Sequence, residues 1–315
     1  MPETPTGGQP PASEPIVRRI QANGLGFGCT EWRAPLRGAH PSLLLVHATG
    51  FHARVWDRML AHLPERHAWA IDQRGHGRSD AAPITHWSVF GHDLAAIAAE
   101  LDLHGAIGIG HSMGGHALVQ AAALAPGRFA RLILIDPVIA APQAYHQTPP
   151  SFPGGMHPAA RRQARFASAA AMLERFASRM PYRVFDPRVL RDYCEHGLLP
   201  AADGEGCTLA CDPGTEAAVY MSGRGNPGVY ASVRALDIPV LIVRAKLPAP
   251  DRDPFDYSFS PTWPGLVGEF RQGREIHLAD RTHFVPMEAP ELVAGIVRDE
   301  LALMGACAPA PAPGG

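Results

Sequence analysis

The feature that most constrains the fold of this chain is a short apolar run that stops at a glycine-rich turn. The run AIGI occupies residues 106–109, the turn GHSMG follows at 110–114, and an Ala/Leu-rich segment continues over 117–125. This order predicts a buried strand that turns sharply into a helix, with Ser112 at the apex of the turn.

The glycines of this turn have a mechanical role. A turn this tight puts the serine in strained backbone geometry, and a side chain at Gly110 or Gly114 would collide with a neighbouring strand or helix. The strain lifts the Ser112 hydroxyl clear of the sheet and leaves the N–H of Met113 free to receive a developing negative charge. Gly and Ser are common in ordinary loops, but the strand before and the helix after favour the G-x-S-x-G turn of a nucleophilic serine.

Continuous apolar runs alternate with helical patterns along most of the chain. Such runs are typical of strands buried on both faces, and they occur at residues 42–46, 68–71, 106–110, 132–135 and 239–243. A further core strand is predicted at 275–278. Helices are predicted at 55–63, 90–103, 117–125 and 290–303, and two edge strands at 16–22 and 26–32. The alternation predicts an α/β fold, a doubly wound and mostly parallel sheet with its site at the carboxyl ends of the strands.

The alternation stops after Asp136, and residues 138–235 are predicted to form a helical cap over the pocket. A first cap helix is predicted to begin at Pro158, because an apolar stripe follows that residue at Phe166, Ala169, Leu173, Phe176 and Met180. A second cap helix is predicted to open at 186–187, where Asp-Pro supplies an N-cap and a first-turn proline, and to close near Gly197. Five arginines of this range are expected to face solvent: Arg161, Arg162, Arg165, Arg175 and Arg179.

Length and composition bound the class of protein. The core is assigned to residues 15–137 and 236–304, and the ends, 1–14 and 305–315, are predicted to be disordered. A net charge of −2 predicts no bulk attraction to nucleic acid or to an anionic membrane. The start lacks the pattern of a signal peptide, and no stretch is long enough to span a bilayer. The five cysteines are odd in number and scattered, which favours reduced thiols in a cytoplasmic protein without a metal site.

Four motifs stand in an order that resembles the α/β-hydrolase fold family. They are HATGF at residues 47–51, DQRGHGRS at 72–79, the turn at Ser112, and THFVP at 282–286, and the resemblance covers roughly 16–136 and 237–304. One departure is Ala48, where the family usually has Gly. The resemblance implies a serine hydrolase of the esterase or lactonase kind with a helical cap. It also implies an oxyanion hole made by the N–H groups of Met113 and Thr49, to which the Thr49 hydroxyl is a possible further donor.

The resemblance assigns the base that Ser112 needs, because a serine hydroxyl is a weak nucleophile until its proton is removed. Of the 16 histidines, His283 follows the last core strand in the loop where the family carries its base. The other candidates have structural interpretations: His111 and His116 line or pack the pocket, and His47 and His76 lie in loops that the family uses for backbone hydrogen bonds.

The acid has two possible positions. The family places it most often in the loop after the strand that ends at Val243, and sometimes after the strand that ends at Ile135. The first loop offers Asp251, Asp253 and Asp256 in a Pro-rich run that looks inserted, whereas Asp136 stands directly at a strand end. We prefer Asp136, because a carboxylate that orients a histidine must sit on a rigid element. The alternative for Asp136 is a residue that caps local backbone.

These assignments predict a serine hydrolase that cleaves a carboxylic ester or lactone of a small, apolar substrate through an acyl-enzyme, without cofactor or metal. His111, Phe51 and Trp263 are predicted to contact the substrate. The same residues also serve C–C bond hydrolases, amidases and cofactor-free perhydrolases, and a non-catalytic receptor for a small ligand is a further alternative. The expected partner is a small molecule, with no nucleic acid and no membrane.

Overall fold

A computed structural model describes residues 14–147, 152, 155–223, 225–249, 256 and 258–306. Within these residues eight strands pair in one sheet, in the order β1-β2-β4-β3-β5-β6-β10-β11. Most of the two ends that we predicted to be disordered, 1–13 and 307–315, lies outside the described residues, and so do Asp251 and Asp253. No helix in the described part is long and apolar enough to cross a bilayer.

The sheet is antiparallel at one edge and parallel across the rest. β1 (Ile16–Ala22) and β2 (Leu25–Trp32) form an antiparallel hairpin, and β2 pairs antiparallel with β4. All other pairs are parallel, among β4 (Ala68–Ile71), β3 (Leu43–Val46), β5 (Ala106–His111), β6 (Phe129–Ile135), β10 (Val240–Arg244) and β11 (Gly273–His277). The doubly wound, mostly parallel α/β sheet is therefore confirmed.

The continuous apolar runs are needed because both faces of the sheet are covered. Along β3, Leu43 and Leu45 pack in one core cluster, whereas Leu44 and Val46 pack in the other, and all four are fully buried. The first cluster includes residues of α1 (Asp57–Ala61), α8 (Val285–Glu288) and α9 (Pro290–Ala306), and the second includes residues of α2 (Ser88–Glu100), α3 (Met113–Leu124) and α7 (Val229–Ala235).

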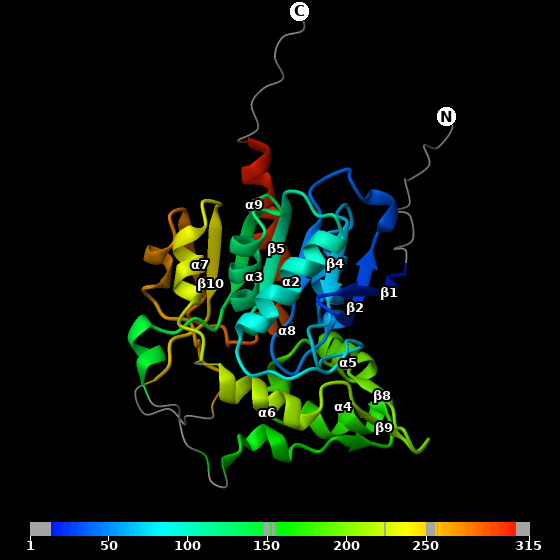
Figure 1. Ribbon diagram of the computed structural model, residues 1–315. Helices are drawn as coiled ribbons and strands as arrows, with labels where there is room; N and C mark the ends of the chain where they lie inside the picture. The colour runs from blue at the N-terminus through cyan, green and yellow to red at the C-terminus, as the bar shows by residue number, and fades with distance from the viewer. Residues whose placement is uncertain are drawn as a thin grey trace, which may run out of the picture.

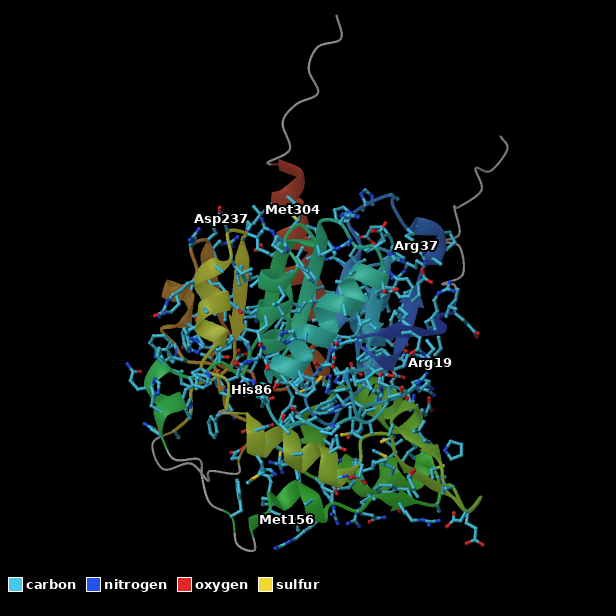
Figure 2. The ribbon with its side chains drawn as sticks, viewed as in Figure 1. Arg19, Arg37, His86, Met156, Asp237 and Met304 are labelled. Carbon is cyan, nitrogen blue, oxygen red and sulfur yellow. The ribbon has the colours of Figure 1, made fainter. Side chains whose placement is uncertain are left out.

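The cap lies beneath one end of the sheet, on the same side as α8 (Figure 1). Its described elements include α4 (Ala169–Ala177), η6 (Tyr182–Val184), α5 (Pro187–His196) and α6 (Pro213–Ser222). A small antiparallel sheet, which we did not predict, joins β7 (Arg165–Phe166), β9 (Cys207–Leu209) and β8 (Leu198–Pro200). Met156 marks the far edge of the cap, and Asp237 and Met304 mark the opposite end of the molecule (Figure 2).

The cap differs from the sequence prediction in two places. No single helix begins at Pro158: a short turn η5 (Pro158–Arg161) leads into β7, and α4 starts only at Ala169 because the Ser168 hydroxyl accepts a hydrogen bond from the N–H of Ala171. α7 falls in the range 138–235 that we assigned to the cap, yet it packs against α3 in the core. The second predicted helix is present as α5, capped by the Asp186 side chain.

Candidate active site

Ser112 lies at the turn between β5 and α3 in strained backbone geometry. Its φ is 58° and its ψ is −118°, a region that a non-glycine residue rarely adopts. A Cβ at Gly110 would lie 2.6 Å from the carbonyl oxygen of Gly114, and a Cβ at Gly114 would overlap the backbone of Val46. Glycine is thus required on both sides of the serine, as the turn motif predicts.

Three residues that we singled out in the sequence meet at this turn. The Nε2 atom of His283 lies 3.0 Å from the Oγ atom of Ser112, and its Nδ1 atom lies 2.6 Å from Oδ2 of Asp136. Ser112 follows β5, Asp136 follows β6, and His283 lies in the loop between β11 and α8. The exposed fractions of the three residues are 5%, 0% and 8%. With Nδ1 protonated and donating to the carboxylate, Nε2 is free to accept the serine proton.

The second oxygen of Asp136 accepts two clear hydrogen bonds. Its Oδ1 atom receives the N–H of Ala245 at 3.1 Å and the hydroxyl of Ser260 at 2.5 Å. The Thr262 hydroxyl lies 3.2 Å from the same oxygen, but its one proton is directed to the carbonyl of Pro137 at 2.7 Å. The Oδ1 position is therefore one for an acceptor. Sequence reasoning missed Ser260 and Thr262, because isolated hydroxyl residues in a loop after β10 carry no recognisable spacing.

The segment after β10 also contains Asp256, the alternative acid that lies within the described residues. The side chain of Asp256 accepts a hydrogen bond from the N–H of Ser258 at 2.9 Å, and the N–H of His283 donates to the carbonyl of Ser258 at 2.9 Å. The segment 258–262 therefore holds the backbone of His283 and, through the Ser260 hydroxyl, the side chain of Asp136. The carboxylate that bonds to His283 in the described part of the chain is Asp136.

The two expected oxyanion donors lie after neighbouring strands, Thr49 in the turn after β3 and Met113 at the start of α3 after β5. Thr49 sits in a turn closed by the bond from the N–H of Phe51 to the carbonyl of Ala48, 3.2 Å long, in which Gly50 has a φ of 79°. Met113 begins α3, so its N–H points out of the first helical turn. The Thr49 hydroxyl, which we considered as a further donor, is directed instead at the sulfur of Met113, 3.6 Å away.

The model of the alpha/beta hydrolase family matches residues 43–296, which include Ser112, Asp136, His283 and the turn of Thr49. The chain belongs to this family. Two curated relatives come from Mycobacterium tuberculosis: the lipase LipV, 40% identical over 102 residues, and an esterase, 29% identical over 174 residues. These matches cover 31% and 54% of this chain and only 38% and 55% of the relatives' own lengths.

A solved structure supports the same fold for nearly the whole of this α/β hydrolase. The structure of E-2-(acetamidomethylene)succinate hydrolase covers 91% of this chain and 98% of its own, with a TM-score of 0.70 and 22% identity. An identity this low shows the shared fold alone.

The residues that we predicted to contact the substrate differ in their surroundings. Phe51 packs against the rings of Tyr193, Phe185 and Phe284, at centroid distances from 5.2 to 6.3 Å. Trp263 packs in the other core cluster, with the residues of α7. His111 is buried, and its Nε2 donates to the carbonyl of His283 at 2.8 Å. His111 therefore supports the backbone of the loop that carries His283.

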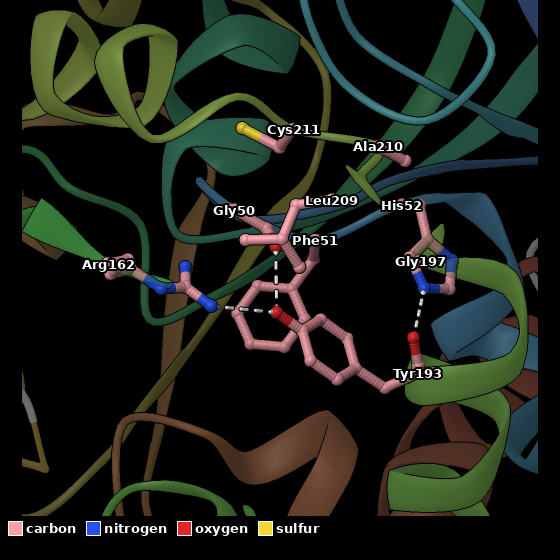
Figure 3. A pocket seen from close by; sticks show the side chains of 9 residues that line it. All are labelled: Gly50, Phe51, His52, Arg162, Tyr193, Gly197, Leu209, Ala210 and Cys211. Carbon is pink, nitrogen blue, oxygen red and sulfur yellow. Dashed lines mark hydrogen bonds between the residues drawn. The ribbon is translucent and has the colours of Figure 1, made fainter. Parts of the chain in front are cut away.

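One of the five cap arginines of this α/β hydrolase does not face solvent. Arg161, Arg165, Arg175 and Arg179 are exposed as predicted, but the Arg162 side chain is only 22% exposed and pairs with the carboxylate of Glu216. Arg162 belongs to a small pocket next to the turn of Thr49 (Figure 3). The pocket is lined by Gly50, Phe51, His52, Arg162, Tyr193, Gly197, Leu209, Ala210 and Cys211.

Buried histidines around the site make the fold sensitive to acid. His116 donates from Nδ1 to the carbonyl of Val138, and His76 donates from Nδ1 to the carbonyl of Arg74. Burial lowers the pKa of each of these two histidines from 6.5 to about 4. Between those values the unfolded chain binds protons that the native protein does not, so stability falls as the pH falls from about 6.5 to about 4.

We expect the lowered pKa of each of these two histidines to reduce the free energy of unfolding by about 2 kcal/mol at pH 5 relative to pH 7. Urea titrations at the two pH values measure the loss. In His116→Gln the amide keeps one donor and one acceptor, so the variant should lose less free energy over this interval than the wild type. Equal losses in the two proteins would contradict the assignment.

Proposed function

We propose that this protein is a serine hydrolase that cleaves a carboxylic ester or lactone of a small, apolar substrate. The observation that carries the proposal is the pair of contacts made by His283, 3.0 Å to the Ser112 hydroxyl and 2.6 Å to the Asp136 carboxylate. A histidine held between a hydroxyl and a buried carboxylate is the arrangement that activates a serine for acyl transfer. The names of the lipase and esterase relatives favour an ester as the bond that is cleaved.

The proposed reaction has two halves. Ser112 attacks the substrate carbonyl while His283 takes its proton, and the N–H groups of Met113 and Thr49 stabilise the oxyanion. His283 then gives the proton to the leaving alcohol, and the acyl group stays on Ser112. Water, deprotonated by the same imidazole, releases the acid and restores the serine. Asp136 holds the imidazole in the productive tautomer throughout.

The surroundings of His283 favour a small, apolar acyl group. Phe284 follows His283 directly, with ring centroids 5.5 Å apart, and Phe51 and Phe185 pack against Phe284. Ser112 and His283 are themselves almost fully buried. An apolar acyl chain gains more from this environment than a charged one does.

The test is turnover of p-nitrophenyl esters of increasing chain length, together with a γ-lactone and the anilide of the best acyl group. We expect the esters or the lactone to be cleaved, the short acyl chains fastest, and a fluorophosphonate to label Ser112 stoichiometrically. Cleavage of the anilide alone would make the enzyme an amidase. Peroxide-dependent peracid formation would favour a perhydrolase, and a β-diketone cleaved in place of the esters would favour C–C bond hydrolysis. Stoichiometric ligand binding without any turnover would favour a receptor.

A further inference from the structure

Helix α5 of the cap holds the turn that carries Thr49 at two points. The Tyr193 hydroxyl donates a hydrogen bond to the carbonyl oxygen of Gly50 at 3.3 Å, and Nε2 of His52 donates to the backbone carbonyl of Tyr193 at 3.1 Å (Figure 3). The Tyr193 ring also packs against Phe51 and stacks on His52, at centroid distances of 5.2 and 5.6 Å. Three consecutive residues after Thr49 are thus fixed by one tyrosine.

The Tyr193 hydroxyl is held in turn by a buried polar cluster of the cap. Arg162 donates to Tyr193 at 3.4 Å and to the Tyr182 hydroxyl at 2.8 Å, and it pairs with Glu216. A Cβ at Gly50 would lie 3.0 Å from the Glu216 carboxylate, so the cluster rests directly on the turn. Burial raises the pKa of Tyr193, which keeps its hydroxyl protonated and able to donate.

Helix α5 is itself anchored to the core. Arg58 of α1 forms two hydrogen bonds with the carboxylate of Asp192, 2.6 and 2.7 Å long, one residue before Tyr193. A two-pronged pair of this kind fixes direction as well as distance. The contact between Tyr193 and Gly50 therefore joins the turn to a helix that cannot easily shift.

The position of this turn matters because of the N–H of Thr49. An oxyanion is stabilised only by donors that lie about 2.7–3.1 Å from it, and a displacement of about 1 Å has a large effect on rate. Ala48, Thr49, Gly50 and Phe51 form one hydrogen-bonded turn, which links the position of Gly50 to that of Thr49. We propose that Tyr193 is a positioning residue for the oxyanion hole, through which the cap sets the direction of the Thr49 N–H. This inference rests on the hydrolase function proposed above.

The test is the variant Tyr193→Phe, which removes the hydroxyl and keeps the ring contacts. We expect kcat for a short activated ester to fall about tenfold while KM changes by less than about twofold. The reason is that a misdirected Thr49 N–H destabilises the transition state, which carries the oxyanion, more than it weakens substrate binding. The inhibition constant of a trifluoromethyl ketone, whose adduct with Ser112 carries an oxyanion, should rise by a similar factor. The matched control is Tyr230→Phe, in which a tyrosine also loses a hydrogen bond to a backbone carbonyl, that of Ala140. Its kcat should stay within about twofold of the wild type.

The outcomes separate this inference from the proposed function. If the wild type neither turns over any substrate nor reacts with a fluorophosphonate, the hydrolase function is wrong. If the wild type is active and Tyr193→Phe keeps both its kcat and its ketone affinity, the positioning role is wrong. A rise in KM alone would make Tyr193 a binding residue. Should Tyr193→Phe fail to fold, Tyr182→Phe removes a hydroxyl that bonds to Tyr193 without touching Gly50; the same split between kcat and KM is then required, and unchanged kinetics would overturn the proposal.

Discussion

Replacing Ser112 with alanine is expected to lower ester turnover by about 10⁴ to 10⁶ while the protein stays folded. The hydroxyl that is lost makes its hydrogen bond with His283, and no other described hydroxyl is within hydrogen-bond distance of that Nε2 atom. Alanine keeps the Cβ of serine, so the strained φ of 58° is unchanged by the substitution. The measurement is kcat for an activated ester, with the thermal midpoint followed by circular dichroism.

Ser222→Ala is a matched control for this prediction. The Ser222 hydroxyl donates to the carbonyl of Ala218 within α6. Its loss therefore also removes one hydroxyl hydrogen bond, but in a cap helix and not at the turn of Ser112. We expect the control to keep wild-type turnover. Activity of Ser112→Ala within tenfold of the wild type would rule out Ser112 as the nucleophile.

The inner strands of the sheet were predictable because most of their buried residues form apolar runs. β3 is apolar throughout and β6 ends in the run 132–135. The structure shows the reason: successive residues of β3 enter core clusters on opposite faces, so no position of β3 tolerates a polar side chain. The turn at Ser112 was predictable for a similar local reason, since Gly110 and Gly114 have no space for a side chain.

The cap was less predictable because its contacts join residues far apart in the sequence. Phe166 continues the apolar stripe of α4 in the sequence, but it lies in β7, paired with Cys207. Arg162 looks like a surface arginine, and its partner Glu216 is 54 residues away with no pattern that links them. Pairing of this kind depends on the tertiary fold and leaves no periodic signal.

The placement of Asp136 shows both the strength and the limit of sequence reasoning. Because β5, β6 and β10 are neighbours, any residue at their carboxyl ends comes near Ser112, and this includes Asp136 and the residues after Val243. Sequence alone therefore leaves two positions open for the acid. In the structure the segment after β10 supplies Ser260, whose hydroxyl donates to the carboxylate of Asp136, and Thr262, whose hydroxyl donates to the carbonyl of Pro137 next to it.

The variant Asp136→Asn tests this arrangement, and we expect it to lower turnover by about 10⁴. The reason lies in the donors around Oδ1, the N–H of Ala245 and the hydroxyl of Ser260. In the variant these donors select the amide oxygen for that position, so the NH₂ group faces Nδ1 of His283. Nδ1 must then accept a hydrogen bond, which puts the imidazole proton on Nε2, where it blocks proton transfer from Ser112.

The control for this variant is Asp256→Asn, the alternative acid that lies in the described part of the chain. Its carboxylate accepts a hydrogen bond from the N–H of Ser258, a contact that an amide oxygen also makes. We therefore expect Asp256→Asn, and likewise Asp251→Asn and Asp253→Asn, to keep most of the turnover of one activated ester, with circular dichroism confirming that all four variants are folded. If Asp136→Asn stays active while one of the other three is inactive, the acid follows β10. Ser260 would then bind a carboxylate that caps local backbone, and the 2.6 Å contact between Asp136 and His283 would have no part in catalysis.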